Sequence, residues 1–465
     1  MDPSNRPPSA APLDRSRAPG PGALRPFNFP PIERFDLPNG LPVLTARTEG
    51  LPVVTLGLLL PAAGVHEPPD RAGLASLAAA LLESGTADRS AAEIAETFEG
   101  LGVQFGAGTG WDATQVEMTA LASRVDAATE LFAELVRAPA LPGDEVDRVR
   151  KEHIAAILQR RAEPRGLANE AAARFVFASD SPFSRPLGGT ATTLEGLTRE
   201  DVADFHAARY TPHGAWVIIA GNLDPTDARD LAASAFGDWI GPVSGGAAVS
   251  AEPAARTRQV VIVDRPGSVQ SEIRVGQVGV GRSTPDYFPL IVMNTILGGA
   301  FTSRLNMNLR EKHGYTYGVS SGFAMRRQAG PFFVSTAVQT EVTAAALTEI
   351  MREIDGIRAA PVDPRELDDA RNYLAGVFPL RLQTTEGVAS RLAELALHEL
   401  PPDYFDDYRD RALAVDSDAV HRVARTYIRP EEMATVIVGD SERIRASIEA
   451  LEVASVQVVD VGELP

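Results

Sequence analysis

Short runs of apolar residues near the start of the chain have the spacing of β-strands. Residues 35–46 (FDLPNGLPVLTA) place Asn39 and Gly40 between two apolar runs, which predicts a hairpin. Val53–Leu60 is apolar at almost every position and predicts a buried strand. At Gln115–Ala122 polar and apolar residues alternate, which predicts a strand with one face exposed. The chain therefore begins with elements of a sheet.

Two segments between these strands have the pattern of helices. Residues 70–83 (DRAGLASLAAALLE) include a long stretch without a polar face, which predicts a helix that is buried. Ser90 and Glu93 form a capping box at the start of the next helix, which should end at a glycine. Strands and helices in this order predict an α+β fold.

A helix–turn–strand unit occurs twice in the sequence. Residues 201–222 and 418–440 each have an Asp, a Tyr nine positions later, then a Pro and an apolar strand that ends in Gly-Asn or Gly-Asp. Asp201 and Asp418 are 217 positions apart. Two unrelated helix–strand pairs can share such a pattern, but the matched spacing favours a duplication.

The duplication divides the chain into two homologous halves, each expected to be a mainly antiparallel sheet with helices packed on it. A Ser/Gly/Ala/Pro-rich stretch at 241–256 lies near the middle of the sequence and is typical of a linker. We predict a disordered Pro/Ser/Arg-rich tail at 1–28, an N-terminal domain at 29–245, a linker at 246–256 and a C-terminal domain at 257–465.

Composition excludes several classes of function. The formal net charge is -18, which argues against nucleic acid or an anionic membrane as a partner. No apolar run approaches the roughly 18 residues of a membrane-spanning helix. The chain has 0 cysteines, which excludes disulfides and thiol nucleophiles.

Several segments together resemble the pitrilysin/insulinase-type zinc metallopeptidases. They are the Asn39-Gly40 turn, the strand Val53–Leu60, residues 73–86 (GLASLAAALLESGT), residues 187–190 (LGGT), the Tyr210/Gly221 unit and residues 297–323 (LGGAFTSRLNMNLREKHGYTYGVSSGF). The resemblance extends over nearly everything after the tail and is strongest to the bacterial and mitochondrial-processing branch. It implies a two-domain chain that forms half of a clam-shell-like dimer.

In catalytic members of this family, the helix after the first strands carries Gly-x-Ala-His-x-x-Glu-His. Its two histidines hold zinc, its glutamate polarises the attacking water, and a third ligand comes from a helix roughly 75 residues later. Here Ser76 and Ala80 replace the histidines and Ala79 replaces the glutamate. Glu152 and His153 stand near the expected third ligand, without partners. No two of the 7 histidines lie within four positions of each other, so we predict no metal site in this chain.

The second half retains residues that the resemblance connects with the substrate. In the family an Arg and a Tyr, seven residues apart, reach a substrate bound over the zinc, and Arg310 and Tyr317 have this spacing. We expect a helix at 301–313 that ends at Gly314 and a strand at Tyr315–Ser320, so that the two side chains converge. An arginine fork can bind a peptide carbonyl and a phenol can donate a hydrogen bond to an oxyanion.

Simpler interpretations of this pair are also open. The helix dipole favours an arginine in a last helical turn, and a tyrosine at a strand start is often half-buried packing. Tyr315 is a second candidate for the tyrosine role. Gly106, Gly108 and Gly110 lie where relatives present an edge strand that pairs with substrate.

The predicted function is that of a zinc-less subunit of a heterodimeric metallopeptidase. A partner subunit would supply His-x-x-Glu-His and zinc, this chain would supply Arg310 and Tyr317, and the chain alone would be inactive. The substrates would be peptides or unfolded segments. A scaffold subunit, like the core proteins of the respiratory bc-type complex, a peptide-binding module and a homodimer remain alternatives. The tail lacks an apolar h-region, which favours the cytoplasm, or the periplasm if a signal was removed.

Overall fold

A computed structural model describes residues 22, 24–243, 245–246 and 249–464. Most of the predicted tail therefore lies outside the described residues. Its last part is anchored: Phe27 packs edge-on against Phe378, and Arg409 donates a hydrogen bond to the carbonyl of Arg25. The predicted tail thus ends before these residues, because apolar side chains hold the chain to the C-terminal half.

The first half contains a six-stranded sheet in the order β1-β2-β6-β3-β5-β4. All of its neighbouring strands are antiparallel except β2 and β6. The predicted hairpin is confirmed, with Gly40 at φ 81°, and the predicted strand Val53–Leu60 is β3. The strands are β1 (Ile32–Asp36), β2 (Pro42–Arg47), β3 (Val53–Leu60), β4 (Gln104–Thr109), β5 (Thr114–Leu121) and β6 (Trp216–Gly221).

The first half contains eight α-helices among the described residues. The capping box of Ser90 and Glu93 is present, and α2 ends at Gly102 in the left-handed conformation, as predicted. The predicted helix 70–83 is shorter, since only seven residues are α-helical and 3-10 turns flank them. The helices are α1 (Leu74–Ala80), α2 (Ala91–Leu101), α3 (Val125–Arg137), α4 (Gly143–Ala162), α5 (Pro164–Val176), α6 (Ala191–Glu195), α7 (Arg199–Arg209) and α8 (Pro225–Phe236).

The second half repeats this arrangement with the sheet order β12-β7-β11-β8-β10-β9. The strands are β7 (Gln259–Asp264), β8 (Gln270–Val278), β9 (Val319–Phe323), β10 (Pro331–Gln339), β11 (Ala434–Gly439) and β12 (Val456–Asp460). The helices are α9 (Tyr287–Asn294), α10 (Thr343–Ala359), α11 (Pro364–Leu380), α12 (Thr385–His398), α13 (Tyr408–Leu413), α14 (Ser417–Tyr427) and α15 (Ser441–Glu449), with the π-helical segments η6 (Thr295–Gly299) and η7 (Asn306–Lys312).

The repeat found in the sequence corresponds to two equivalent units of the fold. Helix α7 leads into β6 in the first half, and α14 leads into β11 in the second. Both strands occupy the third position of their sheets. The outermost strands differ, because β1 is antiparallel to β2 whereas β12 is parallel to β7. The predicted α+β fold of two similar halves, each with a mainly antiparallel sheet, is confirmed.

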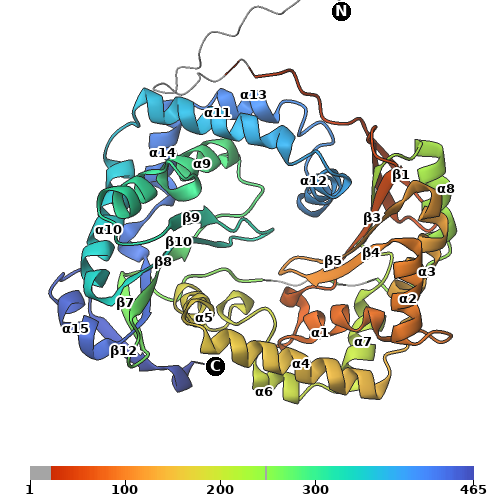
Figure 1. Ribbon diagram of the computed structural model, residues 1–465, viewed down its shortest axis with the longest axis horizontal. Coiled ribbons are helices and arrows are strands. Elements are labelled where there is room, and N and C mark those ends of the chain that lie inside the picture. Colours follow the sequence, from red (N-terminus) through yellow and green to blue (C-terminus); the bar gives the residue numbers. More distant parts are fainter. Residues whose placement is uncertain (1–21, 23, 244, 247–248, 465) are drawn as a thin grey trace, which may run out of the picture.

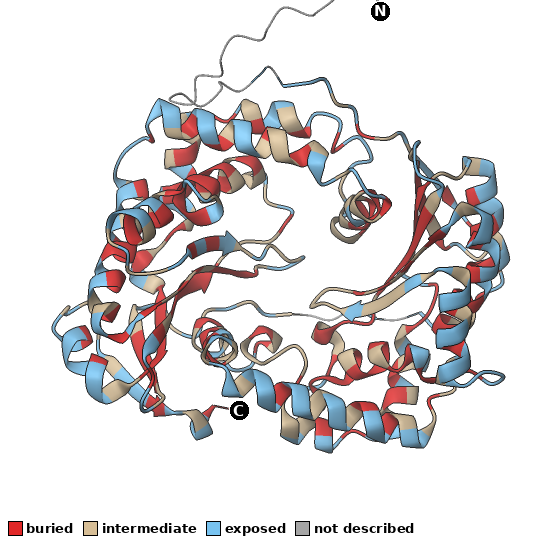
Figure 2. Ribbon diagram, viewed as in Figure 1, coloured by how far each residue is buried: buried red, intermediate tan, exposed pale blue. Residues whose placement is uncertain are grey.

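Each half places one helix on the sheet of the other half (Figure 1). Helix α5, from the first half, packs on β8 and β11, and its apolar residues share a buried cluster with Val261, Val436 and Val438 of the second sheet. Helix α12, from the second half, packs on β3 and β6 of the first sheet. Figure 2 shows buried positions on both sheets and on α12. The two halves are therefore joined by an exchange of helices.

Polar contacts also join the two halves. The hydroxyl of Thr385, at the start of α12, lies 2.7 Å from that of Thr55 in β3, and both residues are buried. In the predicted linker, Pro253 forms a β-bridge with Phe177, and the carbonyl of Glu252 accepts a hydrogen bond from the amide of Ala178. This part of the connection thus packs along the end of α5. No helix in the described part of the chain is long and apolar enough to cross a membrane.

Candidate functional site

The helix that carries zinc ligands in related peptidases is apolar in this chain. The positions of the motif on α1 are Ser76, Ala79 and Ala80, and Ala79 is buried. The carboxylate of Glu67 accepts hydrogen bonds from the amides of Gly73, at 3.2 Å, and Ala75, at 2.7 Å, and so caps this helix. Burial raises the pKa of Glu67 to about 7, and the two backbone hydrogen bonds oppose that rise.

The surrounding residues do not fit a zinc ion. Glu152, near the expected third ligand, instead accepts a hydrogen bond from Arg148 Nη1 at 2.7 Å. Burial lowers the pKa of the neighbouring His153. Among the residues that the structure describes, no three His, Asp or Glu side chains gather where they could hold a metal. An alanine supplies neither a ligand nor a proton carrier, so no hydrolytic step can be assigned to this half.

Arg310 and Tyr317 lie together in the second half, at the end of η7 and in the loop that follows it. The guanidinium carbon of Arg310 is 5.0 Å from the centre of the Tyr317 ring, within the range of a cation–π contact. Gly314 has φ 65° and its amide donates to the carbonyl of Arg310, so the helix ends where the sequence predicted. Tyr317 is 92% exposed. The predicted convergence of the two side chains is therefore present.

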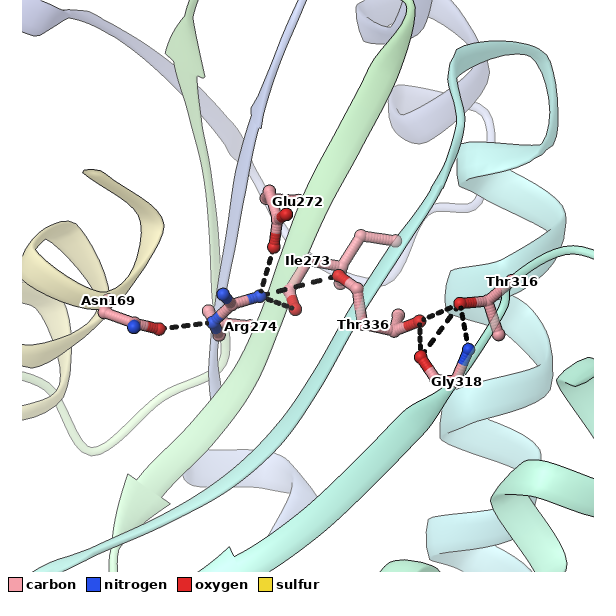
Figure 3. A network of polar contacts seen from close by, with 7 residues as sticks. All are labelled: Asn169, Glu272, Ile273, Arg274, Thr316, Gly318 and Thr336. Carbon is pink, nitrogen blue, oxygen red and sulfur yellow. Dashed lines mark hydrogen bonds and ion pairs between the residues drawn. The ribbon is translucent and has the colours of Figure 1, made fainter. Parts of the chain in front are cut away.

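The predicted strand Tyr315–Ser320 is wrong at its start, because β9 begins only at Val319. The hydroxyl of Thr316 accepts a hydrogen bond from the amide of Gly318 and lies 2.9 Å from its carbonyl. Thr336 in β10 holds the same turn, 2.9 Å from Thr316 Oγ1 and 3.0 Å from the Gly318 carbonyl (Figure 3). Threonine hydroxyls thus satisfy backbone groups that a strand would pair, and residues 314–318 form a loop that presents Tyr317.

A further aromatic residue, Phe301, lies beside Arg310, whereas Tyr315 packs elsewhere. The guanidinium carbon of Arg310 is 4.5 Å from the ring centre of Phe301, which is exposed, and its Nε lies 3.5 Å from Glu311 Oε1. Tyr315, the competing tyrosine, stacks on His313 with ring centres 4.9 Å apart. Phe301 was missed by the sequence analysis, although it lies within the segment LGGAFTSRL that carries the resemblance. Tyr315 is thus held by packing, whereas Tyr317 is accessible.

The predicted edge strand is also present. Strand β4 lies at the edge of the first sheet and contains Gly106 and Gly108, beside which an added Cβ would meet open space. Gly110 follows the strand rather than belonging to it. Such an edge can pair with an extended peptide through main-chain hydrogen bonds.

Two family models match most of the chain. Residues 42–179 match the insulinase peptidases (family M16), and residues 196–374 match the inactive domain of family M16 peptidases. The chain is 26% identical over 414 residues to an uncharacterised zinc protease of Streptomyces coelicolor, covering 87% of this chain and 89% of the relative. It is 26% identical over 370 residues to an uncharacterised zinc protease of Mycobacterium leprae, covering 78% and 82%.

Solved structures show the same fold. A peptidase M16 inactive domain from Pseudomonas fluorescens has a TM-score of 0.83 and 26% identity, and the match covers 88% of this chain and 98% of that one. A protease from Helicobacter pylori has a TM-score of 0.82 at 20% identity, covering 88% and 99%, which shows the fold alone. The chain belongs to the insulinase-type peptidase family M16 and lacks the residues of its zinc site.

Proposed function

We propose that this chain is the zinc-less subunit of a heterodimeric insulinase-type peptidase. A partner with His-x-x-Glu-His would bind the zinc, and the two chains would enclose the substrate as the halves of a clam shell. This chain would supply Arg310 and Tyr317. The zinc proteases of S. coelicolor and M. leprae support the peptidase class, and the substitution of all three motif residues on α1 supports the need for a partner.

The observation that carries the proposal is the exposure of Tyr317. A tyrosine retained only for packing would bury its ring, but this ring is 92% exposed while its loop is held by Thr316 and Thr336. In the complex, the guanidinium of Arg310 can donate two hydrogen bonds to a peptide carbonyl. The phenol of Tyr317 can donate one to the oxygen that gains charge when the peptide bond is attacked.

A single variant distinguishes the proposed function from that of an inert scaffold. R310A should lower kcat/KM of the two-chain enzyme by about 100-fold, because an electrostatic donor at the reacting carbonyl is lost. Assembly, measured by analytical ultracentrifugation, should be unchanged. R445A is the matched control, since Arg445 pairs with Glu449 on its own helix α15. Unchanged turnover of an intact R310A complex would support the scaffold instead.

A peptide-binding module is a second candidate, favoured by the accessible edge of β4. Such a module would capture extended chains without cleaving them, and would need no partner. Binding of a labelled unfolded peptide by the isolated chain, combined with inactivity of the two-chain mixture, would select this candidate.

A further inference from the structure

A polar cavity of about 710 Å³ adjoins Tyr317 on the second sheet. Its walls come from β8, β10, the loop 314–318 and the first turn of α5, the helix that crosses from the other half. Arg310 does not line it, but Tyr317 both lines the cavity and contacts Arg310. The charged side chains that line it are Arg165, Glu272 and Arg274.

Arg274 is fixed inside this cavity and only 3% exposed. Its Nε donates to Asn169 Oδ1 at 2.8 Å, and its Nη1 donates to Glu272 Oε2 at 2.9 Å (Figure 3). Its Nη2 forms no hydrogen bond within the described part of the chain, and this nitrogen is not fully buried. One face of a rigid guanidinium therefore remains available to a ligand.

Arg165 is the second cation of the cavity and is exposed. Among the described residues it has no ion-pair partner. Burial lowers the pKa of Arg274, and the neighbouring Glu272 opposes that change. The positive charge of Arg165 also lowers the pKa of Arg274, which indicates that the two arginines repel each other. Because Glu272 is occupied by Arg274, the cavity has one uncompensated positive charge on a chain of net charge -18.

We propose that this cavity is a subsite for a carboxylate of the bound peptide, held by Arg165 and by Nη2 of Arg274. The inference rests on the proposed function, because Tyr317 places the cavity beside the bond to be cleaved. The carboxylate is either an acidic side chain or the free C-terminus of the peptide. Two like-charged guanidinium groups that face one polar cavity are stabilised by an anion between them.

Direct binding to the full chain tests the subsite without the partner. The probes are fluorescein-labelled decapeptides of Ala, Gly and Ser, measured by fluorescence anisotropy. One set has an amidated C-terminus and a single Glu or Gln moved along the peptide. A second set lacks Glu and compares a free C-terminus with an amide. In one of the sets the carboxylate form should bind about tenfold more tightly.

Arg165 is the position to change, because Arg274 also joins α5 to β8 and its loss endangers folding. R165Q should reduce the preference to twofold or less, whereas R174Q, an exposed arginine on the same helix α5, should retain it. Equal binding of all carboxylate and neutral probes by the unmodified chain, absence of binding, or an unchanged preference in R165Q would each overturn the subsite. Cleavage of a neutral peptide by the two-chain enzyme would still support the proposed function in those cases.

Discussion

The guanidinium carbon of Arg310 lies 5.0 Å from the centre of the Tyr317 ring, although the two residues belong to different elements. Arg310 comes from the π-helical segment η7, and Tyr317 from the loop that precedes β9. Gly314 turns the chain between them in the left-handed conformation. The arrangement leaves the phenol accessible and places a cation beside it.

Removal of the phenolic hydroxyl is the mildest test of Tyr317. Y317F should lower kcat of the two-chain enzyme by about 100-fold and change KM little, since the hydrogen bond strengthens as the oxyanion forms. Y373F is the control, because Tyr373 is also exposed but lies on α11. Steady-state kinetics of both variants provide the comparison. Equal kcat values for Y317F and the unmodified enzyme would remove Tyr317 from the chemistry.

The loop that presents Tyr317 should depend on Thr336. T336V removes a buried hydroxyl that contacts Thr316 and the Gly318 carbonyl, at a cost of about 1–2 kcal/mol in the free energy of unfolding. Amides of residues 314–318 should also exchange faster with deuterium. T348V is the matched control, because the hydroxyl of Thr348 donates a hydrogen bond to a carbonyl of its own helix. Identical exchange in T336V and T348V would show that the threonine contacts do not hold the loop.

The neighbouring residues Glu67 and His66 should make the free energy of unfolding depend on pH in opposite directions. Burial raises the pKa of Glu67 from 4.5 to about 7, so between these values the folded state keeps a proton that the unfolded state has lost. This contribution to stability disappears as pH rises through 7. Burial lowers the pKa of His66 from 6.5 to about 4, assisted by Arg209 and Arg327, so its contribution is lost as pH falls through 4.

The variants E67Q and H66Q separate these two effects. Relative to the unmodified chain, E67Q should gain stability as pH rises from 4.5 to 7, by about 3 kcal/mol at most. H66Q should instead gain relative stability as pH falls from 6.5 to 4. Urea unfolding at a series of pH values measures both differences. A parallel pH dependence for E67Q and the unmodified chain would contradict the assigned pKa.

The exchange of α5 and α12 predicts that the halves do not fold separately. A fragment of residues 29–245 would expose the apolar face of α5, and a fragment of 257–465 would expose that of α12. Each fragment alone should aggregate or lack cooperative unfolding, whereas the two co-expressed should associate and unfold in one transition. Calorimetry checks this outcome. A sharp unfolding transition in either isolated fragment would contradict it.

The sequence predicted the elements whose signals are local. The Asn39-Gly40 turn, β3 and the capping box of Ser90 and Glu93 each depend on a few adjacent residues, and all are present. The position of Gly314 at the end of a helix was likewise predictable, which allowed Arg310 to be placed.

Contacts distant in sequence could not be predicted in this way. The predicted start of β9 was wrong because the loop before it is held by a side-chain contact instead of strand pairing. That contact comes from Thr336, 20 positions beyond Thr316. The apolar pattern of α5 and α12 indicates burial but not which sheet covers them. Arg274 belongs to a strand whose polar positions look like solvent-exposed ones, and only the fold brings Arg165 beside it.

We propose that this chain is inactive alone and completes the active site of a partner. The most direct measurement is cleavage of a quenched fluorescent peptide by this chain, by a His-x-x-Glu-His relative from the same genome, and by their mixture, with zinc quantified in each sample. We expect chelator-sensitive cleavage only in the mixture, and zinc only in the samples that contain the partner. Cleavage by this chain alone would contradict it.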